Sequence, residues 1–253
     1  MASCGTANTE STISKENKDE SMLGANLYLQ SAAEFALLCR QAYENAGEAV
    51  VELSKRTPGD KPFAVVMDLD ETVVDNSAYQ SYLYKSGESY NRDSWDKFVK
   101  EGAVKDSLIT LVPGVYDFIE ICKSSGIQVV FISNRMNSTR METAITLANL
   151  GIDTLGLTSD DSNLMLLRTS ERNKDARRDI VRESFDPQIF IGDNISDFTS
   201  DLENLDQSDR RQKALGSYSA EIGKNWFLIP NPSYGDWVSG SELRNKDYTL
   251  DGK

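Results

Sequence analysis

Residues 63–72, FAVVMDLDET, join an apolar run directly to three acidic residues, Asp68, Asp70 and Glu71. A short, continuous apolar run is typical of a strand that is buried on both faces of a parallel sheet. Carboxylates that follow such a strand are costly to bury unless they are paired or bind a metal. We therefore expect a functional site at the point where this strand ends.

Further apolar runs follow the first one, with helical patterns between them. The helical patterns cover residues 112–126, 137–151 and 171–184, and the first two end at Gly126 and Gly151. Alternating strands and helices predict an α/β fold whose strands are parallel and joined by helical crossovers. The further strands are expected at IQVVFISN (127–134), PQIFIGDN (187–194) and NWFLIPN (225–231), with NLMLLRT (163–169) as another candidate.

Polar residues stand at the ends of three of these runs. Asp68 and Asp70 end the first, Ser133 and Asn134 the second, and Asp193 the third. In an open parallel sheet, ligands bind just beyond the carboxyl ends of the strands. The sequence therefore predicts that these side chains meet at one edge of the sheet.

Composition narrows the chemistry. The chain has 253 residues, of which 39% are hydrophobic and 26% charged, and a formal net charge of −13. These values fit a globular protein of one or two domains, and the charge disfavours a nucleic acid polymer as partner. Histidine is absent, which excludes a Ser-His-Asp triad, an HExxH zinc site and a phosphohistidine intermediate. None of the cysteines (Cys4, Cys39 and Cys122) begins a Cys-x5-Arg motif. Catalysis must therefore depend on carboxylates, hydroxyls, amines or a metal.

The acidic residues fit a magnesium site with a nucleophile. Asp68, Asp193 and Asp197 offer hard oxygen ligands, and Asp70 adds its backbone carbonyl. An ionised Asp68 next to Mg²⁺ could attack phosphorus. Asp70 could then serve as general acid and afterwards as general base.

Other residues could hold the phosphate group. The Ser133 hydroxyl and the Asn134 backbone N–H can donate to phosphate oxygens, and Thr72 of the first motif is a further substrate-binding candidate. Lys174 can neutralise charge in catalysis. The alternatives to Lys174 in the same basic stretch are Arg168, Arg172 and Arg177.

Together these motifs resemble those of the haloacid dehalogenase (HAD) superfamily: D-x-D-x-T at 68–72, Ser133-Asn134, Lys174, and G-D-x-x-x-D at 192–197. Within it, residues 22–253 resemble the bacterial class C acid phosphatases, many of which are surface lipoproteins that dephosphorylate nucleotides. The segments that carry this resemblance include ANLYLQSAAEFALLCRQAY (25–43), SWDKFV (94–99), SNRMNST (133–139) and IPNPSYGDW (229–237).

The resemblance implies a Mg²⁺-dependent acid phosphatase with an aspartyl-phosphate intermediate. In that family Asp68 and Asp193 would bind the metal through their side chains, Asp70 through its carbonyl, and Asp197 in support. The substrate would be a small phosphomonoester, expected to be a nucleoside monophosphate, and the chain could form a homodimer. Two alternatives remain: a phosphotransferase on the same fold, and a non-catalytic surface lipoprotein that binds a ligand. The presence of both Asp68 and Asp70 argues against the latter.

The family also implies a Rossmann-like core with a small helical cap. We expect the cap at residues 22–61 and 77–110, the core at 62–76 and 111–240, and flexible tails at 1–21 and 241–253. A helical pattern from Met22 to Leu53 supports the first cap segment. Its apolar residues are Leu23, Leu27, Phe35, Leu38, Ala42, Val50 and Leu53.

Several assignments stay open. Arg135 could contact phosphate or pair with a carboxylate. Trp95 and Tyr234 match aromatic residues that flank a nucleobase in the family, but either could instead belong to the core. Around Cys4, MASC resembles the end of a bacterial lipoprotein signal, although no charged and apolar regions precede it. As written, the chain would stay in the cytosol. We expect the natural precursor on the cell envelope, facing outside the cytoplasm, and attached to the membrane only through a lipid on Cys4.

Overall fold

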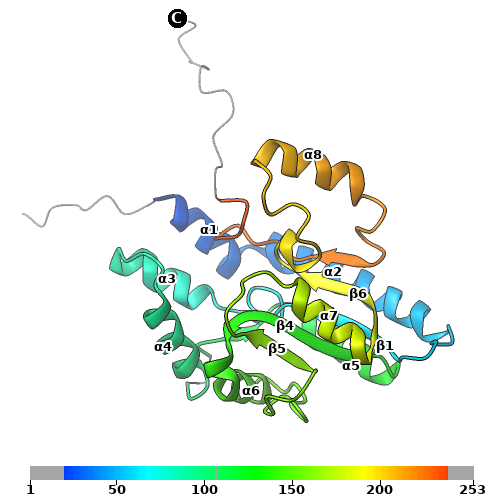
Figure 1. Ribbon diagram of the computed structural model, residues 1–253. Coiled ribbons are helices and arrows are strands. Elements are labelled where there is room, and N and C mark those ends of the chain that lie inside the picture. Colours follow the sequence, from blue (N-terminus) through cyan, green and yellow to red (C-terminus); the bar gives the residue numbers. More distant parts are fainter. Residues whose placement is uncertain (1–19, 106, 239–253) are drawn as a thin grey trace, which may run out of the picture.

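The computed structural model describes residues 20–105 and 107–238, and its centre is a parallel five-stranded sheet (Figure 1). The strand order is β5-β4-β1-β6-β7, and every neighbouring pair is parallel. All five apolar runs form strands, so the predicted α/β fold is confirmed. The strands are β1 (Phe63–Met67), β4 (Gln128–Met136), β5 (Met165–Arg168), β6 (Asp186–Gly192) and β7 (Trp226–Leu228).

Helices fill most of the connections. The three helices that the sequence predicts within residues 112–126, 137–151 and 171–184 are present as α5, α6 and α7. The sequence gives no sign of α8, because its segment QSDRRQKALGS has almost no apolar residues. The helices are α1 (Glu20–Ser31), α2 (Ala33–Ser54), α3 (Ser77–Ser86), α4 (Arg92–Gly102), α5 (Val115–Ser124), α6 (Arg140–Asn149), α7 (Asp175–Ser184) and α8 (Gln207–Ser217). The short elements are the antiparallel pair β2 (Val74–Asp75) and β3 (Thr110–Leu111), and the 3₁₀ turns η1 (Asn137–Thr139) and η2 (Ile195–Asp197).

Both faces of the sheet are covered. Val65 and Met67 of β1 belong to a large apolar cluster that includes residues of α2, α5 and α6. Ala64 and Val66 point to the other face, where they form a smaller cluster with Val181 of α7. Since successive side chains of a strand alternate between faces, a strand covered on both faces must be apolar throughout. This explains the continuous apolar run before Asp68.

The expected helix from Met22 to Leu53 differs in two respects. It is divided into α1 and α2 at Ala32, and Leu23, Leu27 and Leu38 are exposed. In α2, the buried residues recur every three or four positions and form a stripe along one face of the helix. Leu38 lies outside this stripe and is therefore exposed. That stripe consists of Phe35, Cys39, Tyr43, Ala46, Val50 and Leu53.

The division into core and cap stays a prediction. α1 packs on α3, and α4 packs on α6 and η1, whereas α2 packs on α5 and β7. Cys4 and the 241–253 tail lie outside the described residues. Within the described ranges, no helix combines the length and the apolar character that crossing a lipid bilayer requires.

Candidate active site

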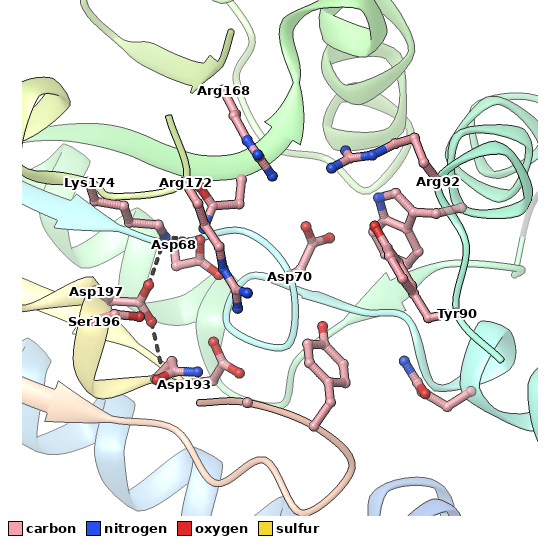
Figure 2. A pocket seen from close by; sticks show the side chains of 16 residues that line it. Asp68, Asp70, Tyr90, Arg92, Arg168, Arg172, Lys174, Asp193, Ser196 and Asp197 are labelled. Carbon is pink, nitrogen blue, oxygen red and sulfur yellow. Dashed lines mark hydrogen bonds and ion pairs between the residues drawn. The ribbon is translucent and has the colours of Figure 1, made fainter. Parts of the chain in front are cut away.

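The carboxyl ends of β1 and β6 open on a cavity of about 430 Å³ (Figure 2). Most of the residues predicted for the site line this cavity, so strands far apart in sequence deliver them to one place. Those that line it are Asp68, Asp70, Trp95, Asn134, Lys174, Asp193, Asp197 and Tyr234. Thr72, Ser133 and Arg135 are not among the lining residues, and each is almost completely buried.

A tight loop after β1 turns both aspartates towards the cavity. The Asp68 N–H still donates to the Ile191 carbonyl of β6 (3.0 Å), so Asp68 continues the strand pairing. The Leu69 carbonyl then accepts from the N–H groups of Val73 (2.8 Å) and Val74 (2.9 Å). Glu71 takes up a left-handed backbone conformation with φ 56°. This reversal places Asp70 on the same cavity wall as Asp68, although alternate residues of a strand point in opposite directions.

Three carboxylates form the acidic end of the cavity. Oxygen atoms of Asp68, Asp193 and Asp197 all lie within 4.8 Å of one another. The Asn231 side chain donates to Asp193 Oδ2 (2.7 Å), and the Asn194 N–H donates to Asp197 Oδ2 (2.9 Å). Asp193 follows β6 directly and Asp197 ends η2, so one short segment supplies both. Such a set of hard oxygen atoms suits a divalent cation.

Lys174 bridges two of these carboxylates. Its Nζ donates to Asp68 Oδ1, to Asp197 Oδ1 (2.7 Å) and to the Ile132 carbonyl (2.8 Å). The side chain is buried, and burial alone would lower the pKa of Lys174, but the charges of Asp197 and Asp68 outweigh it and raise that pKa. The ammonium is therefore charged, and all three of its donor positions are occupied.

The carboxylates repel one another. Burial raises the pKa of Asp68 to about 7, and Asp197 and Asp70 add to this while Lys174 opposes it. Burial also raises the pKa of Asp193 well above its usual range, assisted by the charges of Asp197 and Asp68. A divalent cation between them would favour the ionised carboxylates and remove this repulsion.

Arg135, which does not line the cavity, forms an ion pair with Asp70. Arg135 donates from Nε (2.8 Å) and Nη2 (2.7 Å) to Asp70 Oδ1, and Asn76 Nδ2 donates to the same oxygen (2.9 Å). The Arg135 side chain is 1% exposed. Of the two roles left open for Arg135, the structure shows the carboxylate pair. All three bonds go to Oδ1, so Oδ2 is the atom that can carry a proton into the cavity.

The end of β4 is stabilised by Arg177. Its guanidinium donates to the Ser133 carbonyl (2.5 Å) and to Asn134 Oδ1 (2.8 Å). The Ser133 hydroxyl accepts from the Arg135 N–H (3.1 Å). Asn134 thus reaches the cavity, while Ser133 and Arg177 lie behind it.

Thr72 is also behind the cavity wall. It is completely buried, and its carbonyl accepts from the Tyr43 hydroxyl (2.6 Å). That contact fixes the loop after β1 against α2.

The two predicted aromatic side chains, Trp95 and Tyr234, also line the cavity. Trp95 lines the cavity and is 7% exposed, with its ring 5.0 Å from Tyr79 in an edge-to-face arrangement and 5.6 Å from Phe98. It is therefore both a cavity wall and a packed core residue. Tyr234 comes from the loop after β7, where Asn231 Oδ1 accepts from the Ser233 N–H (2.9 Å).

Several lining residues were not predicted as site residues. Arg168 and Arg172 are alternatives to Lys174 in the sequence, and the structure places both on the cavity wall. For Arg92 the sequence carries only a signal for the start of a helix. Asn91 is the N-cap, and the Asn91 side chain accepts from the Ser94 N–H (2.8 Å). The lining residues missed are Gln80, Tyr90, Arg92, Asn194, Ser196 and Gly235.

Similarities to known proteins agree with this geometry. Residues 5–237 match the model of a family described as HAD superfamily, subfamily IIIB (acid phosphatase). Two solved structures of the class C acid phosphatase from Bacillus anthracis, one of them with tungstate bound, are also similar. Each is 32% identical to this chain, with a TM-score of 0.77, and the match covers 87% of this chain and 88% of the other.

Proposed function

The chain belongs to the acid phosphatases of HAD subfamily IIIB, and from this premise we propose a Mg²⁺-dependent enzyme that acts through an aspartyl-phosphate on Asp68. The resemblance found in the sequence is confirmed, and with it the activity of a phosphomonoesterase on small phosphate esters. The metal, the intermediate and the preferred substrate are the proposed part.

The acidic cluster is the observation that carries this proposal. Three carboxylates share a small space, and Lys174 is the one cation bonded to them within the part of the chain that the structure describes. Asp68 and Asp193 would hold Mg²⁺ through their side chains and Asp70 through its carbonyl, with Asp197 in support. When bound, Mg²⁺ would polarise the phosphoryl group and offset the repulsion between the nucleophile and the phosphate.

The chain's own residues would perform the remaining steps. Lys174 holds Asp68 so that a carboxylate oxygen can attack phosphorus while the bond to the leaving oxygen breaks. Asp70 would protonate the leaving oxygen and later accept a proton from the water that hydrolyses the aspartyl-phosphate. Arg135 and Asn76 fix Asp70 through Oδ1, which leaves Oδ2 for this proton.

The proposed substrate is a nucleoside monophosphate. The volume of the cavity, about 430 Å³, is within the range of pockets that bind small ligands. Trp95 and Tyr234 are proposed to contact the base, and Asn134 the phosphate. The tungstate bound to the Bacillus anthracis enzyme is a tetrahedral oxyanion, as phosphate is, which supports an oxyanion site in the family. Substrate binding by Thr72 and Ser133 stays a prediction.

Phosphate release from p-nitrophenyl phosphate tests the proposal. We expect turnover with Mg²⁺ and its loss after treatment with a chelator, with recovery when Mg²⁺ is restored. Adding an alcohol such as glycerol tests the alternative activity, because a phosphotransferase would form the new ester in place of inorganic phosphate. A protein that released no phosphate from any ester would be a binding protein, and the proposal would be wrong.

We also propose that the precursor is a lipoprotein of the cell envelope, modified on Cys4. Metabolic labelling with a radioactive fatty acid should label the wild-type precursor in a bacterial host. The variant Cys4→Ser should remain unlabelled and leave the membrane fraction. Equal labelling of both proteins would contradict this assignment.

A further inference from the structure

Three arginines line the same cavity as the acidic cluster, and we call them the arginine rim: Arg92, Arg168 and Arg172. Arg92 is the first residue of α4, Arg168 the last residue of β5, and Arg172 lies in the loop before α7. Figure 2 shows Arg92 and Arg168 pointing towards one another across the upper part of the cavity. The rim therefore collects positive charge from segments far apart in the sequence.

Two members of the rim have no carboxylate partner among the described residues. Within residues 20–105 and 107–238, neither Arg92 nor Arg168 forms an ion pair, and Arg168 is held through Nε by the Ser170 carbonyl (3.0 Å). Arg172 donates to Asp236 Oδ1 (3.3 Å), but Asp236 also pairs with Arg210 (3.0 Å). The chain has 40 acidic and 27 basic residues, so the lack of partners at the rim does not follow from a shortage of carboxylates.

The charges of Arg168 and Arg92 change the pKa values of the neighbouring Arg177 and Tyr90. Burial lowers the pKa of Arg177 to about 10; Asp68 opposes this, and the nearby charges of Arg168 and Arg178 lower the pKa further. Burial raises the pKa of Tyr90, and the charge of Arg92 opposes it. An anion bound between Arg92 and Arg168 would be attracted by both charges.

The transferring phosphate does not account for the whole rim. Lys174 lies with the acidic cluster at one end, whereas Arg92 comes from the same helix as Trp95, at the wall proposed to contact the organic part of the substrate. A guanidinium group matches a phosphate with two parallel hydrogen bonds, which makes arginine well suited to a further phosphate. The anion at the rim is thus best supplied by the leaving group.

We propose that the arginine rim binds a second phosphate carried by the leaving group, so that the favoured substrates are phosphomonoesters with a further phosphate, such as nucleoside bisphosphates. This inference rests on the proposed phosphatase function of the same cavity. It adds a charge requirement to the aromatic contacts with the base.

The test compares adenosine 3′,5′-bisphosphate with adenosine 5′-monophosphate, with Mg²⁺ present. We expect a higher kcat/KM for the bisphosphate in the wild-type enzyme. Arg92→Gln and Arg168→Gln should each lose roughly tenfold on the bisphosphate, in line with a lost hydrogen bond to a charged group, and much less on the monophosphate. Arg92→Lys and Arg168→Lys keep the charge and should retain part of the preference.

Arg211→Gln is the matched control, because Arg211 is exposed on α8 and does not line the cavity. It should change neither substrate. Equal kcat/KM for the two substrates in the wild type, or equal losses on both in the rim variants, would overturn the inference. Those results would leave the phosphatase itself intact, whereas the absence of turnover on p-nitrophenyl phosphate would refute the proposed function instead.

Discussion

Asp68 meets the ammonium group of Lys174 on one side and the open cavity on the other. The residue is 7% exposed, so its carboxylate has lost most of its hydration. The same burial that raises its pKa to about 7 would also make it a poorly solvated nucleophile in the proposed mechanism. In the proposed mechanism, the ionisation of Asp68 therefore controls the first chemical step.

The first prediction concerns Asp68→Asn. An amide cannot attack phosphorus and is a poorer metal ligand, so turnover should fall below about a hundredth of the wild-type rate. Phosphate release from p-nitrophenyl phosphate with Mg²⁺ measures this. Asp60→Asn, at an exposed carboxylate, is the control and should keep full activity. A larger residual rate in Asp68→Asn would exclude Asp68 as the nucleophile.

The second prediction concerns pH and metal binding. In the metal-free protein the pKa of Asp68 is raised from 3.8 to about 7, so between these values the folded state binds more protons than the unfolded state does. Stability should therefore fall as pH rises through this window. Mg²⁺ requires ionised carboxylates, so it should raise Tm more at about pH 8 than at about pH 5.

Thermal unfolding with and without Mg²⁺ at both pH values is the measurement. Asp68→Asn lacks this titrating group, and its metal-free Tm should depend less on pH. A Tm increase from Mg²⁺ that is the same at both pH values would show that the carboxylates do not compete with protons for the metal.

At the scale of elements, the site depends on how β6 joins η2. The chain leaves the sheet at Gly192 and returns within five residues, so that Asp193 and Asp197 both reach the cavity. A Cβ atom on Gly192 would lie 2.3 Å from Asp197 Oδ2 and 2.4 Å from Asp197 Cβ. Glycine is required here because the returning segment approaches the strand so closely.

The third prediction is that Gly192→Ala displaces Asp197 and disturbs the acidic cluster. Because the nearest atoms include a Cβ, the backbone itself must shift, at a cost of roughly 1–3 kcal/mol in the free energy of unfolding. Activity and the stabilisation by Mg²⁺ should both decrease.

Gly216→Ala is the matched control, since an added Cβ there meets nothing within 4 Å and Gly216 lies in α8. It should be neutral or stabilise the protein by up to about 1 kcal/mol. Chemical denaturation and Tm shifts measure both variants. Equal effects of the two substitutions would show that the close approach at Gly192 does not matter.

At the scale of the whole molecule, distant parts of the chain supply different walls of the cavity. The ends of β1 and β6 supply the acids, α4 supplies Trp95, and the loop after β7 supplies Tyr234. The acids would recognise any phosphomonoester, so selectivity for the organic group must come from the other lining residues.

The fourth prediction tests those walls with Tyr234→Ala. Stacking on a base is worth roughly 1–3 kcal/mol, so kcat/KM for adenosine 5′-monophosphate should fall roughly 5- to 150-fold. The loss on glycerol phosphate should be much smaller. Tyr116→Ala, at an exposed residue of α5 outside the cavity, should affect neither substrate.

Trp95→Ala should show the same selectivity, but with a loss of stability of roughly 3–5 kcal/mol, because this side chain is also packed against Tyr79 and Phe98. A Tm measurement separates the two effects. Equal losses on both substrates for Tyr234→Ala would assign the tyrosine to phosphate positioning or to structure.

The amino-acid sequence by itself determined the sheet and its acidic edge. Strands buried on both faces leave an unmistakable apolar signal, and the carboxyl ends of parallel strands meet, so Asp68, Asp70 and Asp193 could be brought together from pattern alone. Tertiary structure decided which polar groups face the cavity and which lie behind it. Arg168 and Arg177 belong to the same basic stretch of the sequence, yet Arg177 is buried behind the cavity wall whereas Arg168 lines the cavity. The arginine rim has no signature either, because its members come from α4, β5 and a loop. The direction of a side chain depends on packing between distant segments, which a local sequence pattern does not predict.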